Sequence, residues 1–131
     1  MRVRTMRVLA GPAAAVLLAL PPTAWAGSIW LRAELLGPTP GSGTAAYIQN
    51  GEDRLFDVTV SNLVTSMNTV YVVVNREFVG TIDLDEAGDG ELYLDTQQGD
   101  EVPPLQEGDL IQVIDPDTGT SLLRGVLMRV R

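Results

Sequence analysis

Apolar and polar residues alternate along most of the chain from residue 29 onward, and this alternation predicts β-strands. In the run from 29 to 35 the odd positions are apolar, while Trp30, Arg32 and Glu34 form the opposite face. A period of two places apolar side chains on one side of a strand. Similar runs, many rich in β-branched residues, predict further strands over residues 44–49, 54–62, 69–75, 78–84, 91–95, 109–115 and 121–130. The side chains expected to face the core are Ile29, Leu31, Ala33, Leu35, Phe56, Val58, Val60, Val70, Val72, Val74, Phe78, Ile82, Leu84, Leu92 and Leu94.

Turn-forming residues separate these runs. Asn50-Gly51 predicts a tight hairpin with a type I′ turn, because both residues tolerate positive φ. Asn75-Arg76 or Arg76-Glu77 is expected to form the next tight turn, and residues 116–119 a later one. Turns recur about every 8–12 residues and no segment after the leader has a helical period. We therefore expect an all-β fold, an antiparallel β-sandwich of about 7–8 strands, with a small β-barrel as the alternative.

The first 26 residues have the organisation of a secretory leader. Arg2, Arg4 and Arg7 precede an apolar stretch over residues 8–20, and Ala24-Trp25-Ala26 supplies the small residues required at a cleavage site. The apolar stretch is shorter than the roughly 20 residues of a spanning helix. We predict a signal peptide over residues 1–26 and a single domain over 27–131. The expected location is secreted or periplasmic, with no membrane contact after cleavage.

Composition excludes several kinds of chemistry. The chain has no histidine and no cysteine, and all nine basic residues are arginine. Serine–histidine and cysteine–histidine catalysis, histidine-ligated zinc, disulfides and a lysine Schiff base are therefore excluded. We expect a protein that is not an enzyme and that has no cofactor.

The charge balance of the expected mature chain is strongly acidic. Residues 27–131 contain six arginines against 17 acidic residues, which gives a net charge of −11. Binding to nucleic acid or to an anionic membrane is disfavoured, because both require a basic surface. The excess charge favours a soluble monomer, since copies of the chain repel one another.

The acidic turns raise the question of a calcium site. Residues 83–91 resemble the start of an EF-type loop, with Asp83, Asp85 and Gly88 at the first, third and sixth positions. Ala87 stands where an oxygen ligand belongs, and Leu94 where a carboxylate closes the loop. The pattern therefore favours a hairpin. Calcium stays an alternative, strengthened if both acidic turns lie at one end of the fold, with candidate ligands Asp83, Asp85, Asp89, Asp115 and Asp117.

Two further alternatives involve other side chains. Sugar binding would need aromatic rings aligned on one sheet, and Trp30, Tyr71 and Tyr93 are the outward candidates. A small hydrolase with a pair of carboxylates would need two acids about 5–10 Å apart in a cleft. No motif selects a particular pair.

The layout of glycines from Val79 to Gly125 carries one resemblance. Gly80 lies within a strand, Gly88 and Gly90 in a turn, and Gly99-Asp100 and Gly108-Asp109 border a polar connection. With the leader, this layout resembles small exported bacterial β-sandwich proteins of uncharacterised function. The resemblance implies a β-sandwich fold and an exported location, and it indicates no active site. The expected function is a non-catalytic binding or structural module of the cell envelope or extracellular space.

Overall fold

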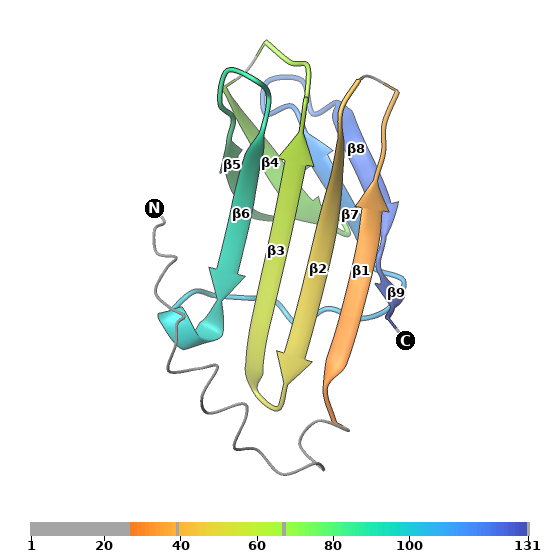
Figure 1. Cartoon of the computed structure of the whole chain (residues 1–131), viewed down its shortest axis with the longest axis vertical. Coiled ribbons are helices and arrows are strands. Elements are labelled where there is room, and N and C mark those ends of the chain that lie inside the picture. Colours follow the sequence, from red (N-terminus) through yellow and green to blue (C-terminus); the bar gives the residue numbers. More distant parts are fainter. Residues whose placement is uncertain (1–26, 39, 67, 131) are drawn as a thin grey trace.

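The chain forms two antiparallel β-sheets that pack face to face (Figure 1). The computed structural model describes residues 27–38, 40–66 and 68–130, and the predicted signal peptide lies outside them. The first sheet has the order β6-β3-β2-β1-β9, and the second has the order β5-β4-β7-β8. The strands are β1 (Ile29–Leu35), β2 (Ser42–Asn50), β3 (Asp53–Ser61), β4 (Thr69–Val74), β5 (Glu77–Asp83), β6 (Gly90–Asp95), β7 (Leu110–Ile114), β8 (Ser121–Val126) and β9 (Met128–Arg129).

One helical element, the short 3-10 helix η2 (Thr96–Gln98), follows β6 within the described residues. No helix in that part of the chain is long and apolar enough to cross a membrane. The predicted all-β class and the antiparallel pairing are confirmed, and the two sheets do not close into the barrel that was the alternative.

Strand periodicity explains the core between the sheets. Leu31, Ala33 and Leu35 of β1 are buried, and Arg32 and Glu34 between them are exposed. The inner faces of both sheets contribute to one apolar cluster. Burial of this surface is the main term that stabilises such a domain. The predicted inward positions are confirmed except for Phe78. Ile29, Leu84 and Leu94 are partly buried against the cluster.

The prediction for Phe78 is wrong because of a β-bulge. Val72 pairs with Gly80, but Val73 pairs with Phe78, so Val79 is an extra residue in β5. A bulge of one residue reverses the faces of the residues before it. Phe78 is therefore 60% exposed, while Val79 packs against the core.

The two tight hairpins form by different turns. A tight turn joins β2 and β3 as predicted. Asn50 pairs with Asp53, however, so the central residues are Gly51 and Glu52 and not Asn50 and Gly51. Gly51 has φ of 66° and Glu52 is not in the left-handed region, which fits a type II′ and not a type I′ turn. The β4–β5 turn has Asn75 and Arg76 at its centre, as in the first of the two predicted registers.

The last predicted strand, residues 121–130, divides at Leu127. Residues 121–126 form β8 in the second sheet, and β9 then pairs with β1 in the first sheet. Leu127 is fully buried where the chain passes between sheets. A bridge between Leu36 and Arg124 links the sheets on the same side. β1 therefore lies inside the first sheet, and β5 and β6 form the edges on the opposite side.

Candidate functional site

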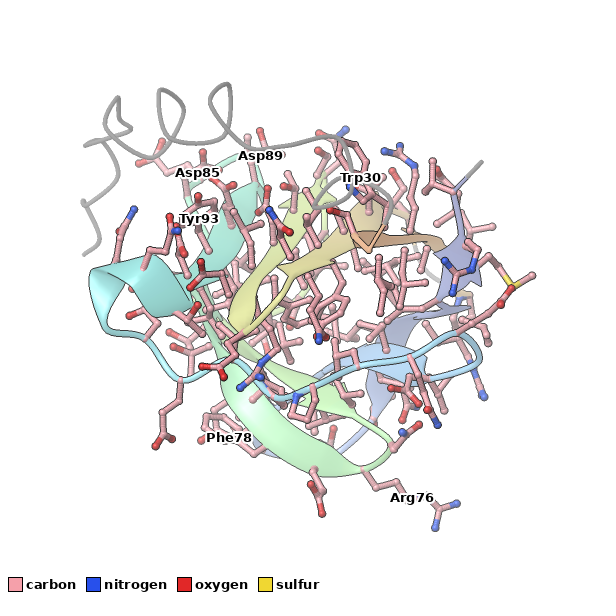
Figure 2. All side chains as sticks on the ribbon, turned by 90° about the horizontal axis from the view of Figure 1, so that it is seen from below. Trp30, Arg76, Phe78, Asp85, Asp89 and Tyr93 are labelled. Atoms are coloured by element: carbon pink, nitrogen blue, oxygen red, sulfur yellow. The ribbon has the colours of Figure 1, made fainter. Side chains whose placement is uncertain are left out.

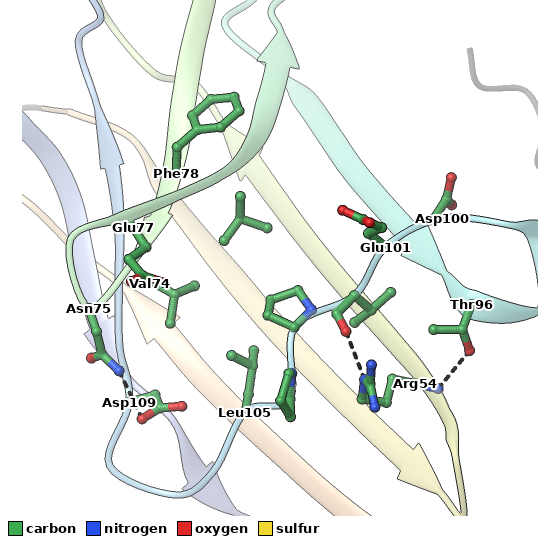
Figure 3. A pocket seen from close by; sticks show the side chains of 14 residues that line it. Arg54, Val74, Asn75, Glu77, Phe78, Thr96, Asp100, Glu101, Leu105 and Asp109 are labelled. Carbon is green, nitrogen blue, oxygen red and sulfur yellow. Dashed lines mark hydrogen bonds between the residues drawn. The ribbon is translucent and has the colours of Figure 1, made fainter.

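A groove of about 750 Å³ lies at the lower end of the fold, between the β4–β5 hairpin and the connection over residues 99–109 (Figure 3). Its size is within the range of ligand-binding clefts. One wall is the hairpin, and the other is the connection together with one side chain of β3. The lining residues are Arg54, Val74, Asn75, Glu77, Phe78, Val79, Thr96, Asp100, Glu101, Val102, Pro103, Pro104, Leu105 and Asp109.

The hairpin wall has an unusual backbone. Asn75 and Arg76 have φ of 50° and 72°, a region that L-residues seldom occupy. Asn75 is held there by its side chain, whose Nδ2 donates to Asp109 Oδ1 at 3.0 Å and whose Oδ1 accepts from the Leu110 N–H at 2.9 Å. The bulge follows directly and turns Phe78 outward and Val79 inward. Strained backbone and bulges are common beside functional sites.

The connection wall is fixed to the core at two points. Val102 and Leu105 are buried, and the Nε of Arg54 donates to the Val102 carbonyl at 2.7 Å. The start of the connection is capped, since the Asp95 side chain accepts from the Gln97 N–H and Asp100 accepts from the Asp95 N–H. The wall is therefore rigid although it lacks regular secondary structure.

The groove is negatively charged. Four carboxylates, Glu77, Asp100, Glu101 and Asp109, line it together with Arg54. Asp100 and Asp109 accept hydrogen bonds that stabilise the connection, the latter from the Gln106 N–H at 2.9 Å. The side chains of Glu77 and Glu101 are exposed and make no hydrogen bond or ion pair within the described part of the chain. The free charge of the groove is thus on these two side chains, one on each wall (Figure 3).

A second feature is a carboxyl pair on the outer face of the first sheet. Asp57 of β3 lies opposite Tyr93 of β6, which places it diagonally from Glu91. Burial, and then the hydrogen bond and charge of Glu91, raise the pKa of Asp57 to about 8. Asp57 Oδ1 is buried and accepts no hydrogen bond from a protein donor in the described residues. The raised pKa favours the protonated form of the Asp57 carboxyl at neutral pH.

Neighbouring Tyr93 is affected by the same surroundings. Burial raises the pKa of its hydroxyl, and the charges of Asp95, Asp57, Glu91 and Asp100 raise it further. Sequence reasoning missed the carboxyl pair, because its members are 34 positions apart and only the β3–β6 register brings them together.

The carboxylates of four calcium candidates accept hydrogen bonds, whereas Asp117 takes part only through its backbone N–H, which donates to Asp115. Asp85 Oδ1 accepts from the N–H groups of Ala87 and Asp89 at 2.9 and 3.0 Å. Asp89 Oδ1 accepts from the Asn62 N–H, and Asp115 Oδ1 from the N–H groups of Asp117 and Thr118. Asp83 accepts from the Thr69 hydroxyl.

Both acidic turns lie at the same, upper end of the fold (Figure 1). Within residues 27–38, 40–66 and 68–130, however, no three potential metal-ligating side chains come together. The turns are therefore explained by their backbone hydrogen bonds, as the hairpin interpretation requires.

The predicted outward aromatic residues lie on different sheets. Trp30 and Tyr93 are on the outer face of the first sheet, and Figure 2 shows Phe78 on the opposite side of the molecule. Tyr71 belongs to that second side, where its ring meets Phe78 edge to face at 5.1 Å between centroids. The alignment of three rings that sugar binding would need is therefore absent from the described residues.

No protein-family model matches the chain, and no curated protein matches it in sequence. The fold and groove define a small all-β domain of two antiparallel sheets with an acidic groove at one end. The resemblance to small exported bacterial β-sandwich proteins stays a prediction.

Proposed function

We propose that this protein is an exported β-sandwich module that acts without catalysis and binds a partner of the cell envelope or extracellular space through the groove at its lower end. The leader sequence supports export, with cleavage after Ala26. The absence of histidine, cysteine and lysine from the sequence supports a non-catalytic role. Monomeric behaviour follows from the net charge.

One observation carries the choice of the groove. Phe78 is 60% exposed at the rim although its strand pattern directs it inward, and the bulge at Val79 is what turns it out. Exposing a large aromatic ring lowers stability by about 1.5–3 kcal/mol relative to burying it. A bulge that exposes this ring beside a groove is typical of a contact surface.

The proposal is tested by mapping backbone amide shifts of the isotope-labelled full chain against a panel of small fragments and short peptides. We expect shifts confined to residues 75–79 and 99–105, and N-terminal sequencing of the exported protein should begin at Gly27. A panel that moves no amide of the groove contradicts the binding role. Retention of the leader contradicts export.

A second candidate function, a small carboxylate-pair hydrolase, is favoured by the protonated state of Asp57 beside Glu91. Glycoside hydrolysis uses one protonated and one ionised acid. This pair lies diagonally on the outer face of a sheet, whereas hydrolases place the two groups about 5–10 Å apart in a cleft that admits the substrate. Release of product from chromogenic glycosides, abolished by Asp57→Asn, would replace the binding proposal with this one.

A further inference from the structure

We infer that the groove binds a basic segment of a partner protein, one in which lysine or arginine stands next to a large apolar residue. This inference rests on the proposed function and specifies the ligand class of the same site. The occupant follows from the charge, the hydrogen-bonding character and the apolar surface of the two walls.

Charge is the first argument. Four carboxylates and one guanidinium line the groove, which leaves it with a net charge of −3. Glu77 and Glu101 are the two acids that no interaction within the described residues neutralises, and they come from opposite walls. A cation between the walls would satisfy both, and the acidic domain would steer a basic partner toward the site.

Hydrogen-bonding character is the second argument. Pro103 and Pro104 have no N–H, and their carbonyls accept no hydrogen bond within the described residues. With Glu77 and Glu101 they make a rim that offers acceptors and few donors. Lysine and arginine side chains carry donors only, so they complement this rim.

Apolar surface is the third argument. Phe78, Val79 and Pro103 border the same space as the two free glutamates. An apolar side chain of the ligand would cover this surface, and the ring of Phe78 would also attract a neighbouring cation. Small cations such as metal ions could use the charge but not this surface, which favours a peptide segment.

Arg54 does not make the groove a site for anions. Its Nε is already bonded to the Val102 carbonyl, and it serves to hold the connection. An anionic ligand would also lie beside the four carboxylates that line the same groove. An anionic peptide is nevertheless included in the test, so that this alternative is an outcome of it.

The experiment measures binding of three fluorescent hexapeptides to the full chain by anisotropy. The first alternates lysine with leucine or phenylalanine, the second replaces each lysine by glutamate, and the third replaces each by glutamine. We expect the lysine peptide to bind at least about tenfold more tightly than the other two, and about 0.5 M salt to weaken it severalfold.

Variants locate the binding in the groove. Phe78→Ala, and the double change Glu77→Gln with Glu101→Gln, should each raise the dissociation constant about fivefold or more. Glu86→Gln is the matched control, since Glu86 is exposed in the β5–β6 turn at the other end of the fold. It should leave binding unchanged, and far-ultraviolet dichroism should show that all variants stay folded.

The outcomes separate this inference from the proposed function. Tighter binding of the glutamine or glutamate peptide, with amide shifts in the groove, overturns the ligand class and leaves the binding role standing. Binding of the lysine peptide that Glu86→Gln weakens as much as the groove variants also overturns the inference, because it would be diffuse attraction. A groove that none of the three peptides perturbs overturns the inference, and it contradicts the proposed function as well if the fragment panel also moves no amide of the groove.

Discussion

Asn75 and Asp109 are 34 positions apart, and the Nδ2 of Asn75 donates to the Asp109 Oδ1 at 3.0 Å. This bond joins the tip of the β4–β5 hairpin to the end of the 99–109 connection. The two walls of the groove are therefore held at a fixed separation by the same residue that forms the turn. Preorganised walls reduce the entropy lost on binding.

Replacing Asn75 should separate the backbone and side-chain contributions. Asn75→Gly keeps the positive φ but loses both side-chain hydrogen bonds, so we expect a loss of about 1–2 kcal/mol in the free energy of unfolding. Asn75→Ala should lose about 1 kcal/mol more, because alanine is strained at this φ. Urea unfolding measures both variants. Equal stability of the two variants would show that the positive φ at position 75 does not destabilise the alanine variant.

Arg76 provides the complementary case, since its φ of 72° is unfavourable for arginine and no hydrogen bond of its side chain holds it there within the described residues. We expect Arg76→Gly to stabilise the domain by about 0.5–1 kcal/mol, the relief of strain exceeding the greater chain entropy of glycine. Thermal unfolding checks this. Arg76→Ala is the control that removes the side chain but keeps the strain, and it should not stabilise.

The strands were predictable because apolar and polar residues alternate over five or more positions in each of them. Reversing the inward face of such a strand would expose several apolar side chains at once, so the pattern determines which face is buried. The core of β1 follows from this pattern directly, and the positions of the two tight hairpins follow from the turn-forming residues near 50–51 and 75–76. The bulge at Val79 was not predictable, because Phe78 is apolar in either register and nothing local marks the extra residue. The division at Leu127 was missed for a similar reason: Val126, Leu127 and Met128 are all apolar, so the sequence does not mark the change of sheet.

The groove was beyond sequence reasoning because its two walls meet only through tertiary structure. The stretch bordered by Gly99-Asp100 and Gly108-Asp109 was predicted as a polar connection, and its role as a wall depends on the burial of Val102 and Leu105. The acidic turns, in contrast, were interpretable from sequence. An aspartate side chain that accepts a hydrogen bond from the backbone N–H two residues later depends only on neighbouring residues.

The acidic turn between β5 and β6 should depend on Asp85 for its backbone hydrogen bonds and not on a metal ion. We expect Asp85→Ala to lower the free energy of unfolding by about 1–2 kcal/mol, because two N–H groups lose their acceptor. Asp85→Asn retains an acceptor and should lose less. Millimolar calcium should leave the melting temperature of the full chain unchanged. A rise that chelator reverses would instead establish the calcium-dependent module.

The carboxyl pair predicts how stability depends on pH. The pKa of Asp57 is about 8 in the folded chain against 3.8 ordinarily, so the folded state binds more protons than the unfolded state between these values. The contribution of Asp57 to the free energy of unfolding is then fully present below about pH 4, and it is lost as the pH rises toward 8. Partial exposure of this face reduces the effect, so we expect a loss of about 1–3 kcal/mol over the window.

Asp57→Asn should remove most of this dependence, because asparagine has no proton to release and can donate to Glu91. The variant is expected to be more stable than the natural chain at pH 9 and similar to it at pH 4, whereas replacing a half-buried residue usually destabilises a protein. Urea unfolding at several pH values measures it, with Asp53→Asn, an exposed position on the same strand, as the control. Since burial is the first cause of the raised pKa, Glu91→Gln should weaken the dependence without abolishing it. A pH profile that Asp57→Asn leaves unchanged would show that Asp57 is not the group that titrates in this window.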